Sequence, residues 1–64
     1  MFEVIGNFVL GEYTILLFDA IPRDFTKIKV NNVTYDVTIP YDIENAVAVK
    51  STADFNNCMV EFVS

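Results

Sequence analysis

The chain has 64 residues, 53% of them apolar, and a net charge of -5 from nine acidic and four basic side chains. This length allows one domain at most, and so large an apolar fraction excludes an intrinsically disordered chain. The presence of a single cysteine, Cys58, and the absence of histidine exclude an internal disulfide and the usual zinc and copper ligands. A chain this small therefore needs a dense core, self-association or both.

The charge balance also bears on binding partners. The basic residues Arg23, Lys27, Lys29 and Lys50 form no basic track in the sequence, whereas nucleic-acid binding requires one. We therefore expect no direct nucleic-acid binding. Because the net charge is negative, we also expect no attraction to anionic membranes. The start, Met1-Phe2-Glu3, has no basic residue and does not resemble a signal peptide. We expect a cytoplasmic protein.

The first third of the chain predicts strands. Met1 to Ile5, Phe8 to Leu10 and Glu12 to Phe18 are of strand length, and Gly6 or Gly11 would permit a bulge or bend between them. The segment Tyr13 to Phe18 is apolar at nearly every position, a pattern typical of a segment that is covered on both faces. A buried helix would also fit this segment, but its β-branched and aromatic content favours a strand.

Residues 27 to 39 predict a β-hairpin after the break at Pro22. Their apolar side chains alternate with polar ones except at Asn31-Asn32, a pair that suits a two-residue turn because Asn tolerates positive φ. The apolar side chains, Ile28, Val30, Val33, Tyr35, Val37 and Ile39, are expected to form the core face. With this turn, Val30 faces Val33, Ile28 faces Tyr35 and Lys27 faces Asp36. A slip by one residue would turn one apolar set outward, so the register is strongly specified.

The segment after Pro40 allows more than one interpretation. Residues 41–45 resemble a turn or a single helical turn that Asp42 could cap. A helix from Asp42 to Lys50 is the competing interpretation, but the alternation at Val47 and Val49 favours a strand over Ala46 to Lys50. Thr52 to Asn57 predicts a loop with a tight turn around Ala53-Asp54-Phe55. The last strand is predicted over Cys58 to Val63, with Val60 and Phe62 inward and Glu61 outward.

These segments predict an all-β, mainly antiparallel fold. We expect a small five- to six-stranded meander or SH3-like barrel in one domain, with room for one short helical turn. The plan of short strands around a tight central hairpin resembles that of SH3-like and translation-factor-type small barrels. The resemblance concerns the fold, and such barrels host many functions, so it assigns no residue a role.

Nothing in the sequence forms a catalytic constellation. Cys58 has no histidine to act as its base, and a lone cysteine at a strand start is typically a small apolar filler. Two acidic clusters, Asp36 with Asp42 and Glu44, and Asp19 with Asp24, could be imagined as a carboxylate or magnesium site. Neither has calcium-loop spacing or an adjoining Gly-rich loop. We predict no catalytic residue, no metal and no cofactor.

The aromatic residues offer a candidate interaction surface. Tyr35 and Tyr41 bracket Pro40, and we expect Phe25, Phe55 and Phe62 nearby in space. Most of the six Phe and three Tyr must pack in the core, but a domain this small is expected to leave some of them exposed. Exposed apolar patches usually mark protein interfaces. We therefore select Tyr41, Phe55 and Tyr35 as the candidate surface.

Three hypotheses about function follow. The first is a non-catalytic protein-interaction module that acts as a homodimer or as a subunit of a complex, because open sheets expose edges that invite strand pairing. The alternative is an acidic decoy or inhibitor that binds a basic surface of a nucleic-acid enzyme or translation factor. The third, a small-ligand or catalytic β domain, requires Asp36, Asp42 and Glu44 to converge in a pocket.

Overall fold

The structure is a computed structural model that describes residues 2–51, 55 and 57–64, and its regular elements are all β-strands. The predicted all-β fold is confirmed, with seven strands rather than five or six. No helix occurs in these residues, and the segment after Pro40 forms bends and a turn. The strands are β1 (Phe2–Glu3), β2 (Gly6–Leu10), β3 (Tyr13–Leu17), β4 (Lys27–Val30), β5 (Val33–Thr38), β6 (Ala46–Val49) and β7 (Met59–Val63).

The β4–β5 hairpin has the predicted register. Val30 pairs with Val33, Ile28 with Tyr35, and Lys27 with Asp36. Asn31 and Asn32 form the turn with φ of 50° and 66°, the two positive values that a type I′ hairpin turn demands. The Nζ of Lys27 donates a hydrogen bond to Oδ1 of Asp36 across the polar face. Local alternation and turn chemistry thus determined this element.

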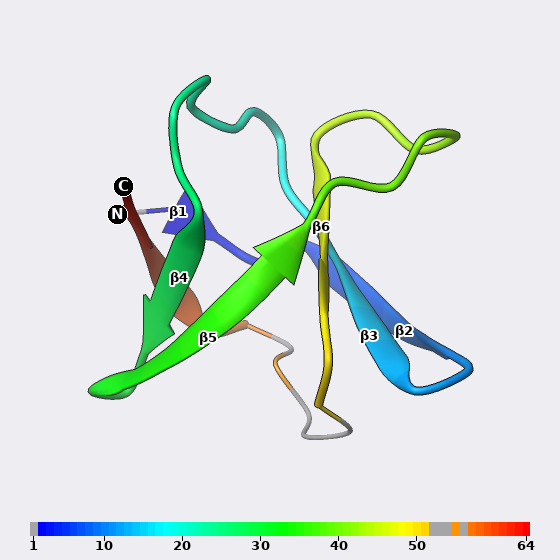
Figure 1. The fold of residues 1–64 in the computed structure, drawn as a ribbon, viewed down its shortest axis with the longest axis horizontal. Coiled ribbons are helices and arrows are strands. Elements are labelled where there is room, and N and C mark those ends of the chain that lie inside the picture. The colour runs from blue at the N-terminus through cyan, green and yellow to red at the C-terminus, as the bar shows by residue number, and fades with distance from the viewer. Residues whose placement is uncertain (1, 52–54, 56) are drawn as a thin grey trace.

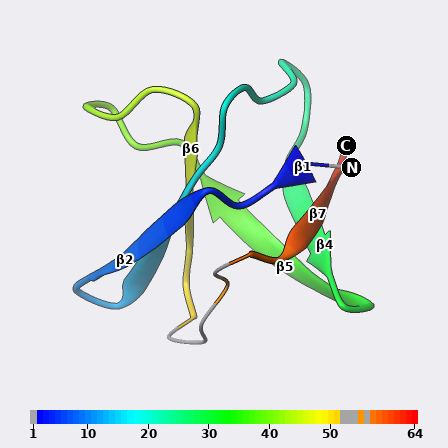
Figure 2. The ribbon, with the colours of Figure 1, turned by 180° about the vertical axis from the view of Figure 1, so that it is seen from behind.

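The strands form one antiparallel sheet that curls into a half-barrel. Its order is β1-β7-β4-β5-β6-β3-β2, which differs from a simple meander because β7 lies between β1 and β4, and β6 between β5 and β3. The strands at the two ends, β1 and β2, are consecutive in the chain and are joined by Val4 and Ile5 alone. The amide of Val4 donates to the Cys58 carbonyl at 3.0 Å, and that of Ile5 to the Leu17 carbonyl at 2.9 Å. The sheet must therefore curl to bring its ends together (Figure 1, Figure 2).

The inner face of the curled sheet carries the main core. Most of the phenylalanines pack here, in edge-to-face contacts around Phe62: ring centroids lie 4.9 Å away for Phe2, 5.3 Å for Phe18 and 4.6 Å for Phe25. Such geometry suits the quadrupoles of the rings. The buried members of this core cluster are Val4, Leu16, Phe18, Ile28, Val30, Val47, Val49, Phe55 and Val60. The inner core thus accommodates most of the aromatic residues of the chain.

The predicted core face of the hairpin is only partly buried. Val33 is 49% exposed at the tip of the hairpin, and Ile39, beyond the end of β5, is exposed as well. Alternation assigns both to the core face, so that prediction is wrong for these two residues, which lie at the first position of β5 and just beyond its last. The predicted loop at Thr52 to Asn57 lies mostly outside the described residues.

The last two strands were predicted correctly. Residues 46–49 form the strand β6 rather than part of a helix. In β7, Val60 is buried and Glu61 is exposed, as predicted. Phe62 packs against the inner core as expected. In the described part of the chain there is no helix long and apolar enough to cross a membrane.

Candidate functional site

The three residues selected from the sequence separate in the structure. Phe55 is buried in the inner core, and Tyr35 packs edge-to-face on it with ring centroids 5.4 Å apart. Tyr41, which follows β5, is fully exposed. The structure therefore brings Tyr35 and Phe55 together inside the half-barrel and leaves Tyr41 on the surface.

A second apolar cluster lies on the opposite face of β3 and β6 from the main core. Side chains directly opposite one another on neighbouring strands share a face. Phe8 pairs with Ile15, which in turn pairs with Ala48, while Leu17 pairs with Ala46. Ile15, Ala46 and Ala48 are buried as a group, with Leu17 and Ile43 packed against them. We call this side of β2, β3 and β6 the outer face.

The rim of the outer face exposes large apolar side chains. Leu10 is 61% exposed and Phe8 41%, and Tyr13, the partner of Leu10 across the hairpin, is also exposed. Leu10 and Tyr13 adjoin an open hollow of about 350 Å³ between the β2–β3 hairpin and the end of β5. Among the described residues, those that line it include no charged side chain: Leu10, Tyr13, Ile15, Thr38, Ile39, Pro40, Tyr41 and Ala48. Tyr41 therefore belongs to this surface.

The edge strand β2 borders the outer face. In the described sheet it has a hydrogen-bonded neighbour on one side, β3. Phe8, Val9 and Leu10 are all exposed, so β2 presents apolar side chains on both of its faces. Gly11, with φ of 66°, provides the positive φ of the two-residue turn into β3. Figures 1 and 2 show the resulting β2–β3 hairpin projecting from one side of the molecule.

The acidic cluster of Asp36, Asp42 and Glu44 does not gather into a site. Asp36 is ion-paired with Lys27 on the hairpin, whereas Asp42 and Glu44 are exposed in the connection between β5 and β6. Within residues 2–51, 55 and 57–64, no three cysteine or carboxylate side chains lie close enough together to hold a metal ion. Cys58 is half-buried and packs against the inner core, as an apolar filler does.

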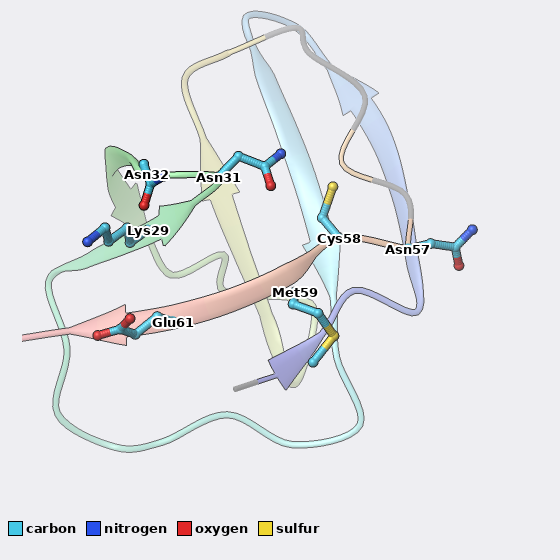
Figure 3. A pocket seen from close by; sticks show the side chains of 7 residues that line it. All are labelled: Lys29, Asn31, Asn32, Asn57, Cys58, Met59 and Glu61. Carbon is cyan, nitrogen blue, oxygen red and sulfur yellow. The ribbon is translucent and has the colours of Figure 1, made fainter.

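A second hollow, of about 430 Å³, lies beside the tip of the β4–β5 hairpin (Figure 3). It is lined by Lys29, Asn31, Asn32, Asn57, Cys58, Met59 and Glu61. In Figure 3 the side chains of Lys29 and Glu61 extend toward one side, while that of Asn57 extends toward the opposite side. Binding sites for small molecules need polar groups that converge on one point, and these polar groups diverge.

Comparisons with protein-family models, with curated proteins and with solved structures gave no match to this chain. The candidate site therefore rests on the geometry of the outer face and of β2.

Sequence reasoning selected Tyr41 and missed Phe8, Leu10 and Tyr13. A signal for them was present, because residues 8 to 10 are apolar on both strand faces and carry no charge. A chain this short has too few residues to cover both faces of β2 as well as both faces of β3. Some apolar side chains therefore remain exposed at the edge formed by β2.

Proposed function

We propose that this protein is a non-catalytic protein-interaction module that binds through its outer face, either to its own copy or as a subunit of a complex. The observation that supports this proposal is the uncharged rim formed by Phe8, Leu10, Tyr13 and Tyr41 around a buried apolar centre. Contiguous exposed apolar side chains of this kind are typical of protein interfaces. Removing apolar area from water contributes roughly 25 cal/mol per Å², so burying this rim would drive association.

The composition of the outer face also resembles that of an interface. Cores of interfaces are depleted in charge and enriched in aromatic residues, and Phe8, Tyr13 and Tyr41 provide three aromatic rings. Glu12, in the turn that follows β2, forms an ion pair with Lys50: the Lys50 Nζ and Glu12 Oε2 atoms lie 3.9 Å apart, and both side chains are exposed. An apolar centre with such charges beyond it is the usual anatomy of a protein-binding surface.

The experiment compares serine substitutions on and off the outer face. Leu10→Ser and Tyr41→Ser remove exposed apolar groups from it, and Val33→Ser removes one from the hairpin tip, which is the matched control. Association is measured by light scattering for the chain alone and by reciprocal co-purification for a partner. We expect the two outer-face substitutions to weaken association and Val33→Ser to leave it unchanged.

Two results would overturn the proposal. One is association that Val33→Ser weakens as much as Leu10→Ser does. The other is a chain that stays monomeric at high concentration and co-purifies with no partner. The dependence of binding on ionic strength distinguishes this proposal from the acidic decoy. Added salt dissociates a complex held by charge but not one held by apolar contacts.

A further inference from the structure

The edge of β2 lacks the features that usually protect a free strand. Its residues, Gly6–Leu10, include no lysine, no proline and no charged side chain. Natural sheets commonly protect an exposed edge with such residues, because an open row of backbone N–H and C=O groups invites another strand. Val9 is 60% exposed on this edge. An apolar edge without these protecting residues is open to pairing with another strand.

We propose that the strand that pairs with β2 is the β2 of a second copy of this chain. The two strands run antiparallel about a two-fold axis at Phe8, so that Phe8 faces Phe8 of the other copy, Asn7 faces Val9, and Gly6 faces Leu10. This inference rests on the proposed function, since it names the partner and the part of the surface used.

Charge explains how two copies that each carry a net charge of -5 can meet here. In this register every facing pair along β2 is uncharged, so no carboxylate opposes another. Like charges directly opposite would be destabilising. At the other end of the described sheet, β1 offers two residues, one of which is Glu3. Self-pairing at β2 therefore brings no like charges face to face.

A stable dimer needs more buried area than the edge of β2 alone provides. A standard interface buries about 800 Å² on each partner, which is about a fifth of the 4366 Å² of accessible surface of this chain. The edge of one five-residue strand falls short of that area. The exposed side chains of Ile5, Leu10 and Tyr13 beside the edge must therefore contribute.

The symmetry of the pairing limits its size. A two-fold interface uses the same patch on both copies and closes on itself. Pairing β2 with β2 occupies the unprotected edge of each copy. The assembly therefore stops at two chains and does not grow into a fibre. Other apolar edges of the same kind would be needed for further growth, and β1 is short and acidic.

Cysteine cross-linking tests the register. In a Cys58→Ser background, Asn7→Cys and Val9→Cys are made separately, and the two proteins are oxidised alone and after mixing. Facing residues of antiparallel strands have Cα atoms about 4.5–5.5 Å apart, inside the range of about 4.4–6.8 Å that a disulfide spans. Residue 9 of one copy lies about 8 Å from residue 9 of the other, because the two are offset by two residues.

We expect the mixture to give a disulfide-linked dimer of two 7.3 kDa chains and each variant alone to give little. Phe8→Cys alone should cross-link readily, since residue 8 faces itself. The Asn7→Cys and Val9→Cys variants both retain Phe8. Their mixture therefore still tests the register if Phe8→Cys does not fold. Amide NMR dispersion checks the fold of each variant.

The failure of this inference differs from failure of the proposed function. A chain that dimerises without this positional selectivity overturns the β2 pairing and leaves the outer face as an interface. If the chain is monomeric but binds another protein, and Leu10→Ser abolishes that binding, the pairing with a second copy is wrong and the proposed function stands. If the chain is monomeric and binds no partner, both proposals are wrong.

Discussion

Phe8 and Ile15 lie directly opposite each other across the β2–β3 ladder, yet Phe8 is 41% exposed and Ile15 is 2% exposed. Ile15 is flanked on both sides, by Phe8 on β2 and by Ala48 on β6, whereas Phe8 has a neighbouring strand on one side in the described sheet. The outer face is therefore closed at its centre and open at the edge of β2. This contrast underlies the proposed interaction surface.

Truncating these two side chains should separate stability from association. We expect Ile15→Ala to lower the free energy of unfolding by about 2–5 kcal/mol, the usual cost of removing a buried Ile or Leu side chain. Phe8→Ala should cost clearly less at low protein concentration, because part of its ring is already in water. Urea unfolding of both variants checks this. Equal losses would contradict the exposure of Phe8.

The turn at Asn31-Asn32 gives a second prediction. Both residues have positive φ, which costs roughly 1–2 kcal/mol for a residue such as alanine but little for glycine. Asn32→Ala should therefore destabilise the protein by about 1 kcal/mol, whereas Asn32→Gly should be neutral or stabilising, since Asn-Gly is the preferred type I′ pair. Thermal unfolding of the two variants measures the difference. A stable Asn32→Ala variant would rule out this turn.

The ion pair between Lys27 and Asp36 should contribute little. Their side chains are 46% and 85% exposed, and exposed pairs are typically worth about 0.2–1 kcal/mol. A double-mutant cycle with Lys27→Ala and Asp36→Ala should give a coupling energy below about 1 kcal/mol that shrinks as salt is added. A larger, salt-independent coupling would show that the pair is shielded from solvent.

Thr14 is a buried polar residue of β3 whose Oγ1 donates a hydrogen bond to the carbonyl of Ser51. Thr14→Val keeps the shape of the side chain and removes the donor, so it should cost about 1 kcal/mol, the net contribution of one hydrogen bond. Thr14→Ser keeps the donor and serves as the control for the hydroxyl. Chemical unfolding of both compares the two contributions. If Thr14→Val is as stable as the natural chain, the hydrogen bond does not contribute to the fold.

The sequence predicted the elements that depend on neighbours along the chain. The β4–β5 hairpin follows from alternation and the Asn31-Asn32 turn, and both are local. Periodicity could not decide whether residues 13–17 form a helix or a strand, because β3 is covered on both faces: Leu16 belongs to the inner core and Ile15 to the outer cluster. The placement of β6 beside β3 resolves the question, and that contact is distant in sequence.

The candidate site was predicted in part for the same reason. The exposure of Tyr41 follows from its position in a polar segment after Pro40, whereas the burial of Phe55 depends on its packing against Tyr35. No local pattern reveals that contact. Alternation likewise does not reveal the exposure of Val33, at the hairpin tip, or of Ile39, beyond the end of β5.

The molar mass of the chain in solution, measured by light scattering over a range of concentrations, tests the proposed β2 interface most directly. Three proteins are compared: the natural chain, Val9→Lys, which places a charge on the free edge of β2, and Val33→Lys, which places one at the hairpin tip, where the valine is also about half exposed. We predict a mass of two chains for the natural protein and for Val33→Lys, and of one chain for Val9→Lys. A natural chain that remains monomeric at every concentration, or a Val9→Lys variant that remains dimeric, would contradict it.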